Sequence, residues 1–238
     1  MSRVSLLLAA LLVAPACDGA KPTDANAKAE GEQPKGTPAA KGDAPASSPK
    51  PEADSPADPP ADPWQSKLAA RVLADSGLGK DGKLTAFDIV NCESGEQYCQ
   101  VCRFGGSPKL MAVGSLDDAA FQEDLKDLDA IVKKYGEDKV KAFAVVTDIV
   151  DGKGVTPKDV ESLKKQANEL RRKLAISFPV VVPAPGDGGG NREWDEYYNI
   201  TKSRTVMFAD GRNTVRWSAV GPEDWSALNE AIKAVVQS

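Results

Sequence analysis

Three cysteines lie close together in the chain and carry its most specific chemical signal. Cys99 and Cys102 form a Cys-x-x-Cys pair, and Cys92 precedes them. This spacing is found in thiol–disulfide redox sites, in structural disulfides and in half of many zinc sites. The residue types alone leave these three alternatives open.

The residues around the pair decide how reactive its thiols can be. A reactive thiol is usually activated by a helix N-terminus or by a neighbouring cation. The Gly-Gly-Ser-Pro sequence of Gly105–Pro108 predicts that no helix follows the pair, which would then lie in a loop over Asn91–Pro108. Arg103 supplies a cation, whereas Glu93 and Glu96 would oppose it. We therefore expect only weak activation of the thiols.

Cys92 leaves the pairing of the cysteines open. The fourth cysteine, Cys17, lies far away near the N-terminus, so three cysteines are left to pair among themselves. In an oxidising compartment this odd number gives one disulfide and one free thiol. Cys92 is therefore a candidate resolving or structural cysteine, and it could pair with either Cys99 or Cys102. Zinc would need a fourth ligand from a nearby glutamate, and we assign no metal site.

Composition excludes several other kinds of chemistry. The sequence contains no histidine, so Ser–His and Cys–His nucleophile pairs and histidine-ligated metals are excluded. The glycine-rich segment 186–192 lacks the Gly-Lys-Ser/Thr of a phosphate-binding loop, and we expect no bound cofactor. The net charge is −5 and there is no basic run, so nothing indicates a nucleic-acid partner.

The N-terminus resembles an export signal. Arg3 is followed by the apolar stretch Val4–Val13 and by Ala-Pro-Ala, a pattern that predicts a signal peptide over Met1–Ala16. Ala14–Cys17 resembles a bacterial lipobox, which implies lipidation of Cys17. We therefore expect a lipoprotein that is anchored to the membrane of the bacterial cell envelope and faces the periplasm or the exterior. Its expected partners are the thiols or disulfides of envelope proteins.

The segment after Cys17 has the composition of a linker. Asp18–Pro63 contains ten prolines and no Val, Ile, Leu, Met or aromatic residue. Such a segment cannot bury enough apolar surface to offset its chain entropy. We predict a disordered linker over residues 17–63 and a folded domain over residues 64–238.

Hydrophobic periodicity within residues 64–238 predicts an alternation of helices and strands. The expected strands are 85–90, 109–113, 140–147, 178–182, 205–209 and 214–219. The expected helices are 67–75, one from Asp117 to Gly136, one capped by Thr156, a short one over 194–198 and one opened by Pro222. Strands 205–209 and 214–219 are joined by a predicted hairpin turn.

This order resembles the thioredoxin fold with the additional α/β piece of the redoxins. Three phrases carry the resemblance: Lys109–Gly136 as the first core strand and long helix, Leu174–Val182 (LAISFPVVV) as a redoxin strand, and Ser203–Gly221 as the terminal hairpin. The resemblance implies an α/β domain with a central mixed sheet and helices on both faces, preceded by the disordered tail. By analogy, Cys99 would be the nucleophile and Cys102 its partner.

The chain departs from that family at two positions. Active thioredoxins carry Cys-x-x-Cys at the start of the long helix, where this chain has the cysteine-free segment Gly114–Ala120. They also place a cis-proline before the hairpin, where this chain has Arg204. The pattern resembles secreted bacterial thioredoxin-like proteins with a displaced Cys-x-x-Cys. Two functions follow as alternatives: a thiol–disulfide oxidoreductase, or a catalytically inactive interaction module of the cell envelope with a structural disulfide.

Overall fold

The structure, a computed structural model, describes residues 62–237. The predicted signal peptide, Cys17 and nearly all of the predicted linker lie outside the described residues. The elements are α1 (Pro63–Ala69), β1 (Asp88–Asn91), β2 (Gln97–Cys99), α2 (Gln100–Phe104), β3 (Lys109–Gly114), α3 (Ala119–Tyr135), β4 (Lys141–Val146), β5 (Asp148–Val150), β6 (Lys153–Val155), α4 (Val160–Leu174), β7 (Val180–Pro183), the π-helical turn η1 (Glu193–Tyr197), β8 (Thr205–Ala209), β9 (Val215–Val220) and α5 (Ser226–Val236).

A seven-stranded mixed sheet forms the centre of the domain, in the order β2-β1-β7-β4-β3-β8-β9. Strands β3, β4 and β7 are parallel, as expected for strands joined by the helices α3 and α4. The hairpin β8–β9 adds an antiparallel edge next to β3. The antiparallel pair β1–β2 forms the other edge, against β7. The expected mixed α/β sheet is confirmed.

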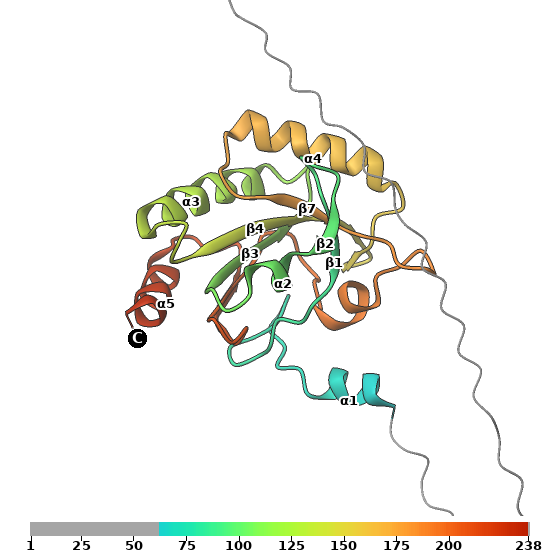
Figure 1. Ribbon diagram of the computed structural model, residues 1–238, viewed down its shortest axis with the longest axis horizontal. Coiled ribbons are helices and arrows are strands. Elements are labelled where there is room, and N and C mark those ends of the chain that lie inside the picture. The colour runs from blue at the N-terminus through green and yellow to red at the C-terminus, as the bar shows by residue number, and fades with distance from the viewer. Residues whose placement is uncertain (1–61, 238) are drawn as a thin grey trace, which may run out of the picture. The chain divides into compact units, whose positions relative to one another are not determined.

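Side chains on β3 alternate between two core clusters on opposite faces of the sheet. Leu110 and Ala112 pack in the first core cluster with residues of α3, α4 and α5. Met111 and Val113 pack in the second core cluster with residues of α1, α2 and η1. This alternation follows from the two-residue period of a strand. Figure 1 shows α3 and α4 on one side of the sheet and α1 on the other.

Several boundaries differ from the sequence predictions for local reasons. The first helix begins at Pro63 and not at Lys67, because Asp62 caps it and proline suits the first helical position. Helix α4 is capped by Asp159, whose carboxylate accepts from the Ser162 N–H at 2.9 Å. Thr156, the expected cap, donates its hydroxyl to Asp195 at 2.8 Å.

Two further differences concern the later part of the chain. The last helix begins at Ser226, some way after Pro222. The small hairpin β5–β6 follows β4 and was not predicted. Its strands are three residues each, too short to show a period in the sequence.

Candidate thiol–disulfide site

Cys99 and Cys102 are joined by a disulfide, and Cys92 is a free thiol. The Cα atoms of the bonded pair are 5.2 Å apart. The other two pairings that the sequence left open, Cys92 with either cysteine of the pair, do not form.

The pair lies at the start of a short helix, so the prediction of a loop over Asn91–Pro108 was wrong. Cys99 ends β2 and is the N-cap of the five-residue helix α2, and its sulfur accepts the Cys102 N–H at 3.1 Å. The glycines that follow do not prevent this helix but end it. Gly105 takes a positive φ of 51°, a conformation that glycine adopts at little cost.

Tertiary contacts hold α2 in place. Val101 and Gln100 are buried, and the Gln100 side chain accepts from the Tyr98 hydroxyl at 2.6 Å. The Phe104 ring meets the Phe143 ring of β4 edge to face, with centroids 5.8 Å apart. An isolated helix of this length would not form in water, so these contacts account for its presence.

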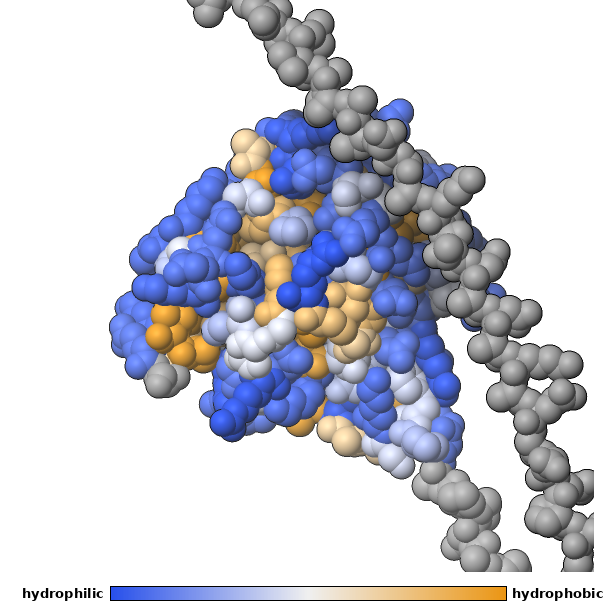
Figure 2. Space-filling model, in the orientation of Figure 1, coloured by the Kyte–Doolittle hydropathy of each residue, from blue (hydrophilic) through white to orange (hydrophobic). Residues whose placement is uncertain are grey.

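The two sulfur-bearing residues differ in exposure. Cys102 is exposed, whereas Cys99 is half-buried and packs against the second core cluster. In the orientation of Figure 1, Figure 2 shows apolar surface near the middle of this face, where α2 lies, bordered by hydrophilic side chains. The disulfide is therefore accessible from the side of Cys102.

The charged side chains around the disulfide mostly form ion pairs with one another. Arg103 lies over the Tyr98 ring at 3.5 Å and forms an ion pair with Glu96 at 2.5 Å. The hydrogen bond that Arg103 donates to the Glu96 carboxylate raises the pKa of Arg103, which stays cationic. Glu93 pairs with Arg171 at 3.1 Å. Both glutamates were expected to offset the positive charge of Arg103. Only Glu96 contacts Arg103, because Glu93 pairs with Arg171.

Behind the pair, a buried lysine fixes the end of α2. The Lys109 ammonium donates to the carbonyl of Gly105 at 2.8 Å and also contacts the side-chain oxygen of Asn213 in the β8–β9 turn. Burial lowers the pKa of Lys109, and nearby Asp210 partly offsets that effect. The backbones of Gly106 and Gly211 approach so closely that a Cβ at Gly211 would collide with the Gly106 carbonyl. The segment after α2 is therefore fixed against the hairpin.

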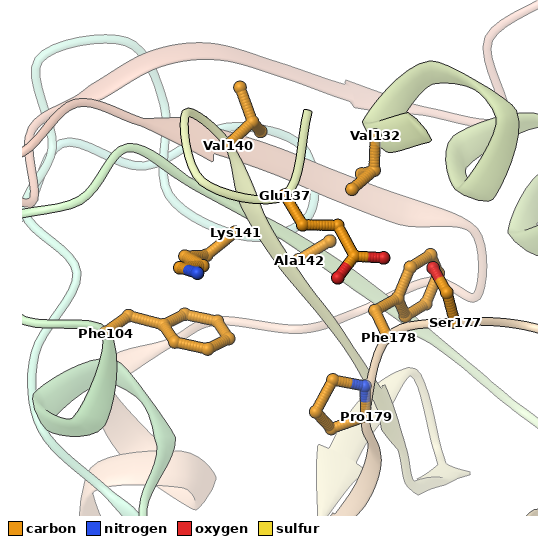
Figure 3. A pocket seen from close by; sticks show the side chains of 9 residues that line it. All are labelled: Phe104, Val132, Glu137, Val140, Lys141, Ala142, Ser177, Phe178 and Pro179. Atoms are coloured by element: carbon orange, nitrogen blue, oxygen red, sulfur yellow. The ribbon is translucent and has the colours of Figure 1, made fainter. Parts of the chain in front are cut away.

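A small cleft opens beside α2 (Figure 3). Phe104 of α2 forms one wall, and the other side chains come from the ends of α3, β4 and the segment before β7. Figure 3 shows the Glu137 carboxylate directed toward Ser177 and Phe178. The cleft has a volume of about 170 Å³, below the roughly 300–1,000 Å³ of common small-molecule sites. It indents the surface beside Phe104 at the end of α2.

Comparison with solved structures identifies the architecture. A protein from Bacteroides thetaiotaomicron, described as a disulfide isomerase, matches 68% of this chain and 94% of its own, with a TM-score of 0.51 and 9% identity. The thioredoxin domain of a thiol–disulfide oxidoreductase from Bacteroides vulgatus matches 66% of this chain and 99% of its own, with a TM-score of 0.51 and 13% identity. The described domain has a thioredoxin-like fold. No family model and no curated protein matches the sequence.

Polar side chains lie at the start of α3 and just before β8, the two places where the sequence departs from active thioredoxins. Asp118 caps α3 by accepting the N–H groups of Ala120 and Phe121. Arg204, at a positive φ of 60°, donates to both carboxylate oxygens of Asp124 at 2.8 and 3.0 Å. Residues 62–237 contain no cis peptide bond. In the described residues, the start of α3 carries no cysteine, and the residue before β8 is Arg204.

Cys92 lies away from the disulfide. It packs in the first core cluster, whereas Cys99 packs against the second. Burial raises the pKa of the Cys92 thiol to about 12, with a smaller opposing effect of Lys164. This surrounding suits a structural cysteine, and direct exchange with the disulfide would require Cys92 to leave its core cluster.

Metal ligation and membrane crossing find no support in the described part of the chain. Over residues 62–237, no three Cys, Asp or Glu side chains are grouped closely enough to hold a metal ion. In the same residues, no helix has both the length and the apolar composition to cross a bilayer.

Proposed function

We propose that this protein exchanges disulfides with the thiols of other proteins through Cys99 and Cys102. The observation that carries the proposal is an accessible Cys-x-x-Cys disulfide at the start of a helix in a thioredoxin-like fold. The Cys102 N–H points to the Cys99 sulfur, and such a hydrogen bond stabilises a thiolate. The displaced position of the pair does not remove these local requirements for exchange.

Reduction of insulin by dithiothreitol tests this proposal. We expect the described domain to accelerate insulin precipitation, and we expect Cys99→Ser and Cys102→Ser to abolish the acceleration. Cys92→Ala is the matched control, because it removes a thiol from the other core cluster and should leave the rate unchanged. Equal rates with and without the parent protein would contradict the proposal.

The alternative is an inactive interaction module whose disulfide is structural. The cysteine-free segment Gly114–Ala120 and the Arg204–Asp124 pair at the usual redox position favour it. In that case the Cys99→Ser/Cys102→Ser double variant should lose about 2 kcal/mol of stability, the loop-closure value for so short a loop, and insulin reduction should be absent from the parent. The insulin assay therefore separates the two functions.

We further propose that the protein is exported and anchored to the cell envelope through lipidated Cys17. The support is the signal-peptide pattern of Met1–Ala16 and the lipobox-like Ala14–Cys17. A disulfide within the domain is consistent with an oxidising compartment, where envelope proteins with thiols or disulfides would be its partners. Mass spectrometry of the mature N-terminus should find diacylglyceryl-modified Cys17. An unmodified N-terminus and a protein in the soluble fraction would contradict anchoring.

Residues 17–63 would act as a flexible linker between the lipid anchor and the folded domain. Their proline-rich composition without large apolar residues supports this role. Limited proteolysis should trim the protein to a stable core that begins near Trp64. Protection of cleavage sites between Lys21 and Lys50 would contradict a disordered linker.

A further inference from the structure

The two sulfurs of the disulfide have different surroundings, and the difference bears on the direction of attack. Cys102 is exposed, whereas Cys99 is half-buried and packs, like Tyr98 and Phe104, against the second core cluster. A thiolate attacks a disulfide in line with the sulfur–sulfur bond, from behind the sulfur that it joins. Because Cys102 is exposed and Cys99 is half-buried against the second core cluster, an incoming thiolate has more open access to Cys102.

The hydrogen bonds of the pair distinguish the sulfurs in the same sense. The Cys99 sulfur accepts the Cys102 N–H at 3.1 Å, and in the part of the chain that the structure describes no donor reaches the Cys102 sulfur. A thiolate released at Cys99 would keep that hydrogen bond, which favours the charged form. A better-stabilised thiolate is the better leaving group in disulfide exchange. The exposure of Cys102 and the stability of the thiolate that would leave from Cys99 therefore both favour attack at the Cys102 sulfur.

We propose that Cys102, and not Cys99 as analogy suggests, is the sulfur that forms the mixed disulfide with a partner protein. The inference rests on the proposed function and assigns the two roles within it. A partner thiolate forms a sulfur–sulfur bond to Cys102, the Cys99–Cys102 bond breaks, and its electron pair remains on Cys99 as a thiolate. The partner's second thiol gives its proton to solvent and attacks the partner sulfur bound to Cys102. The partner leaves as a disulfide, oxidised by two electrons, and both cysteines of the pair are reduced.

The reverse reaction uses the same assignments. The Cys102 thiolate attacks a partner disulfide and releases one partner thiolate. Cys99, held by the Cys102 N–H, then attacks the Cys102 sulfur, which restores the internal disulfide and releases the second partner thiolate. In both directions Cys99 is the internal cysteine: it is released as a thiolate when a partner attacks Cys102, and it attacks the Cys102 sulfur when the internal disulfide re-forms.

Single-cysteine variants test this assignment with oxidised glutathione as the probe. In a Cys92→Ala background, Cys99→Ser leaves only the Cys102 thiol in the domain, and Cys102→Ser leaves only Cys99. We expect glutathionylation, followed by mass spectrometry, to be about tenfold or more faster at Cys102 than at Cys99, because the incoming disulfide must reach the sulfur. Faster modification of Cys99 would overturn the assignment.

A second measurement needs no substitution at the pair. The reduced Cys92→Ala protein is mixed with oxidised glutathione, quenched early with iodoacetamide and mapped by peptide mass spectrometry. We expect glutathione on Cys102 and the alkyl group on Cys99, and the opposite distribution would overturn the assignment. If insulin reduction succeeds while glutathione is found on Cys99, only the assignment fails. If the parent neither reduces insulin nor takes up glutathione, the proposed function fails and the assignment fails with it.

Discussion

Lys109 and Gly105 are joined by a hydrogen bond from the buried ammonium to the carbonyl at the end of the cysteine-bearing helix, at 2.8 Å. The same ammonium contacts Asn213 in the β8–β9 turn. A side chain at the start of β3 therefore connects the candidate redox helix with the hairpin at the edge of the sheet.

Replacing Lys109 by Met should destabilise the domain and loosen α2. The substitution leaves the Gly105 carbonyl and the Asn213 side chain without their buried donor, which costs about 1–3 kcal/mol. Chemical denaturation measures the loss, and the glutathionylation rate of the pair reports on α2. Lys126→Met, at a lysine whose side chain is 46% exposed on α3, is the control and should change stability by less than about 0.5 kcal/mol. Equal stability of the two variants would contradict the role of Lys109.

Cys92 should make stability depend on pH in the alkaline range. Its folded pKa of about 12 exceeds the ordinary 9.0 because the thiol is buried. Above pH 9 the unfolded chain loses this proton and the folded chain keeps it, so the unfolded state binds fewer protons and stability falls as pH rises. The slope from this group approaches about 1.4 kcal/mol per pH unit.

Urea denaturation between pH 8 and pH 11 measures that slope. In Cys92→Ala the slope should be smaller by the contribution of the thiol. Native protein should also resist alkylation at Cys92 until it unfolds. Rapid alkylation of Cys92 in the folded protein would contradict the burial of its thiol.

Arg204 should stabilise the domain through Asp124 despite its own backbone conformation. Arg204→Ala leaves the buried Asp124 carboxylate without its bidentate partner, and we expect a loss of about 3 kcal/mol. Arg204→Gly also removes the pair but relieves the positive φ of 60°, so it should be less destabilising than Ala by roughly 1 kcal/mol. Thermal and urea denaturation of the two variants measure both effects. If Ala and Gly were equally stable, the backbone at this position would not be strained.

Asp129 should contribute stability that is lost in acid. Burial would raise the pKa of Asp129, but hydrogen bonds from Lys133 and Ser177 outweigh it and lower the pKa below 3.8. The carboxylate accepts both the N–H and the hydroxyl of Ser177, at 2.8 and 2.7 Å, and so ties α3 to the segment before β7. As pH falls below 3.8 the unfolded chain takes up the proton first, so stability falls with falling pH until the folded carboxyl is protonated too.

Substitution by Asn should flatten this acid dependence. Asp129→Asn removes the titrating group, and it should also cost about 1–3 kcal/mol near neutral pH through the lost charged acceptor. Glu123→Gln, at a side chain that is 70% exposed, is the control and should retain the acid slope. An unchanged slope in Asp129→Asn would contradict the assignment of this linkage.

The sequence by itself determined the order of the main elements and the class of the fold. Short apolar runs located β3, β4 and β8, and a helical repeat of apolar residues located α3, whose start was expected near Asp117 and whose closing glycine, Gly136, was visible in the sequence. These signals are local, because a buried strand shows as an apolar run, and a long amphipathic helix as an apolar period, within its own residues. The Cys-x-x-Cys pair also stood out from spacing alone, whereas its catalytic role, the lipidation of Cys17 and the linker remain predictions.

Only the tertiary structure decided how the cysteines are arranged. Helix α2 exists because Val101 and Phe104 pack against the sheet and Lys109 binds its last carbonyl. These partners are distant in sequence or have no periodic signature, so the local pattern of Gly105–Pro108 suggested a loop. The pairing of Cys99 with Cys102, and the placement of Cys92 in the other core cluster, likewise follow from which face of the sheet each segment covers. A single residue's side of a sheet depends on strand register, which long-range pairing fixes and local sequence does not.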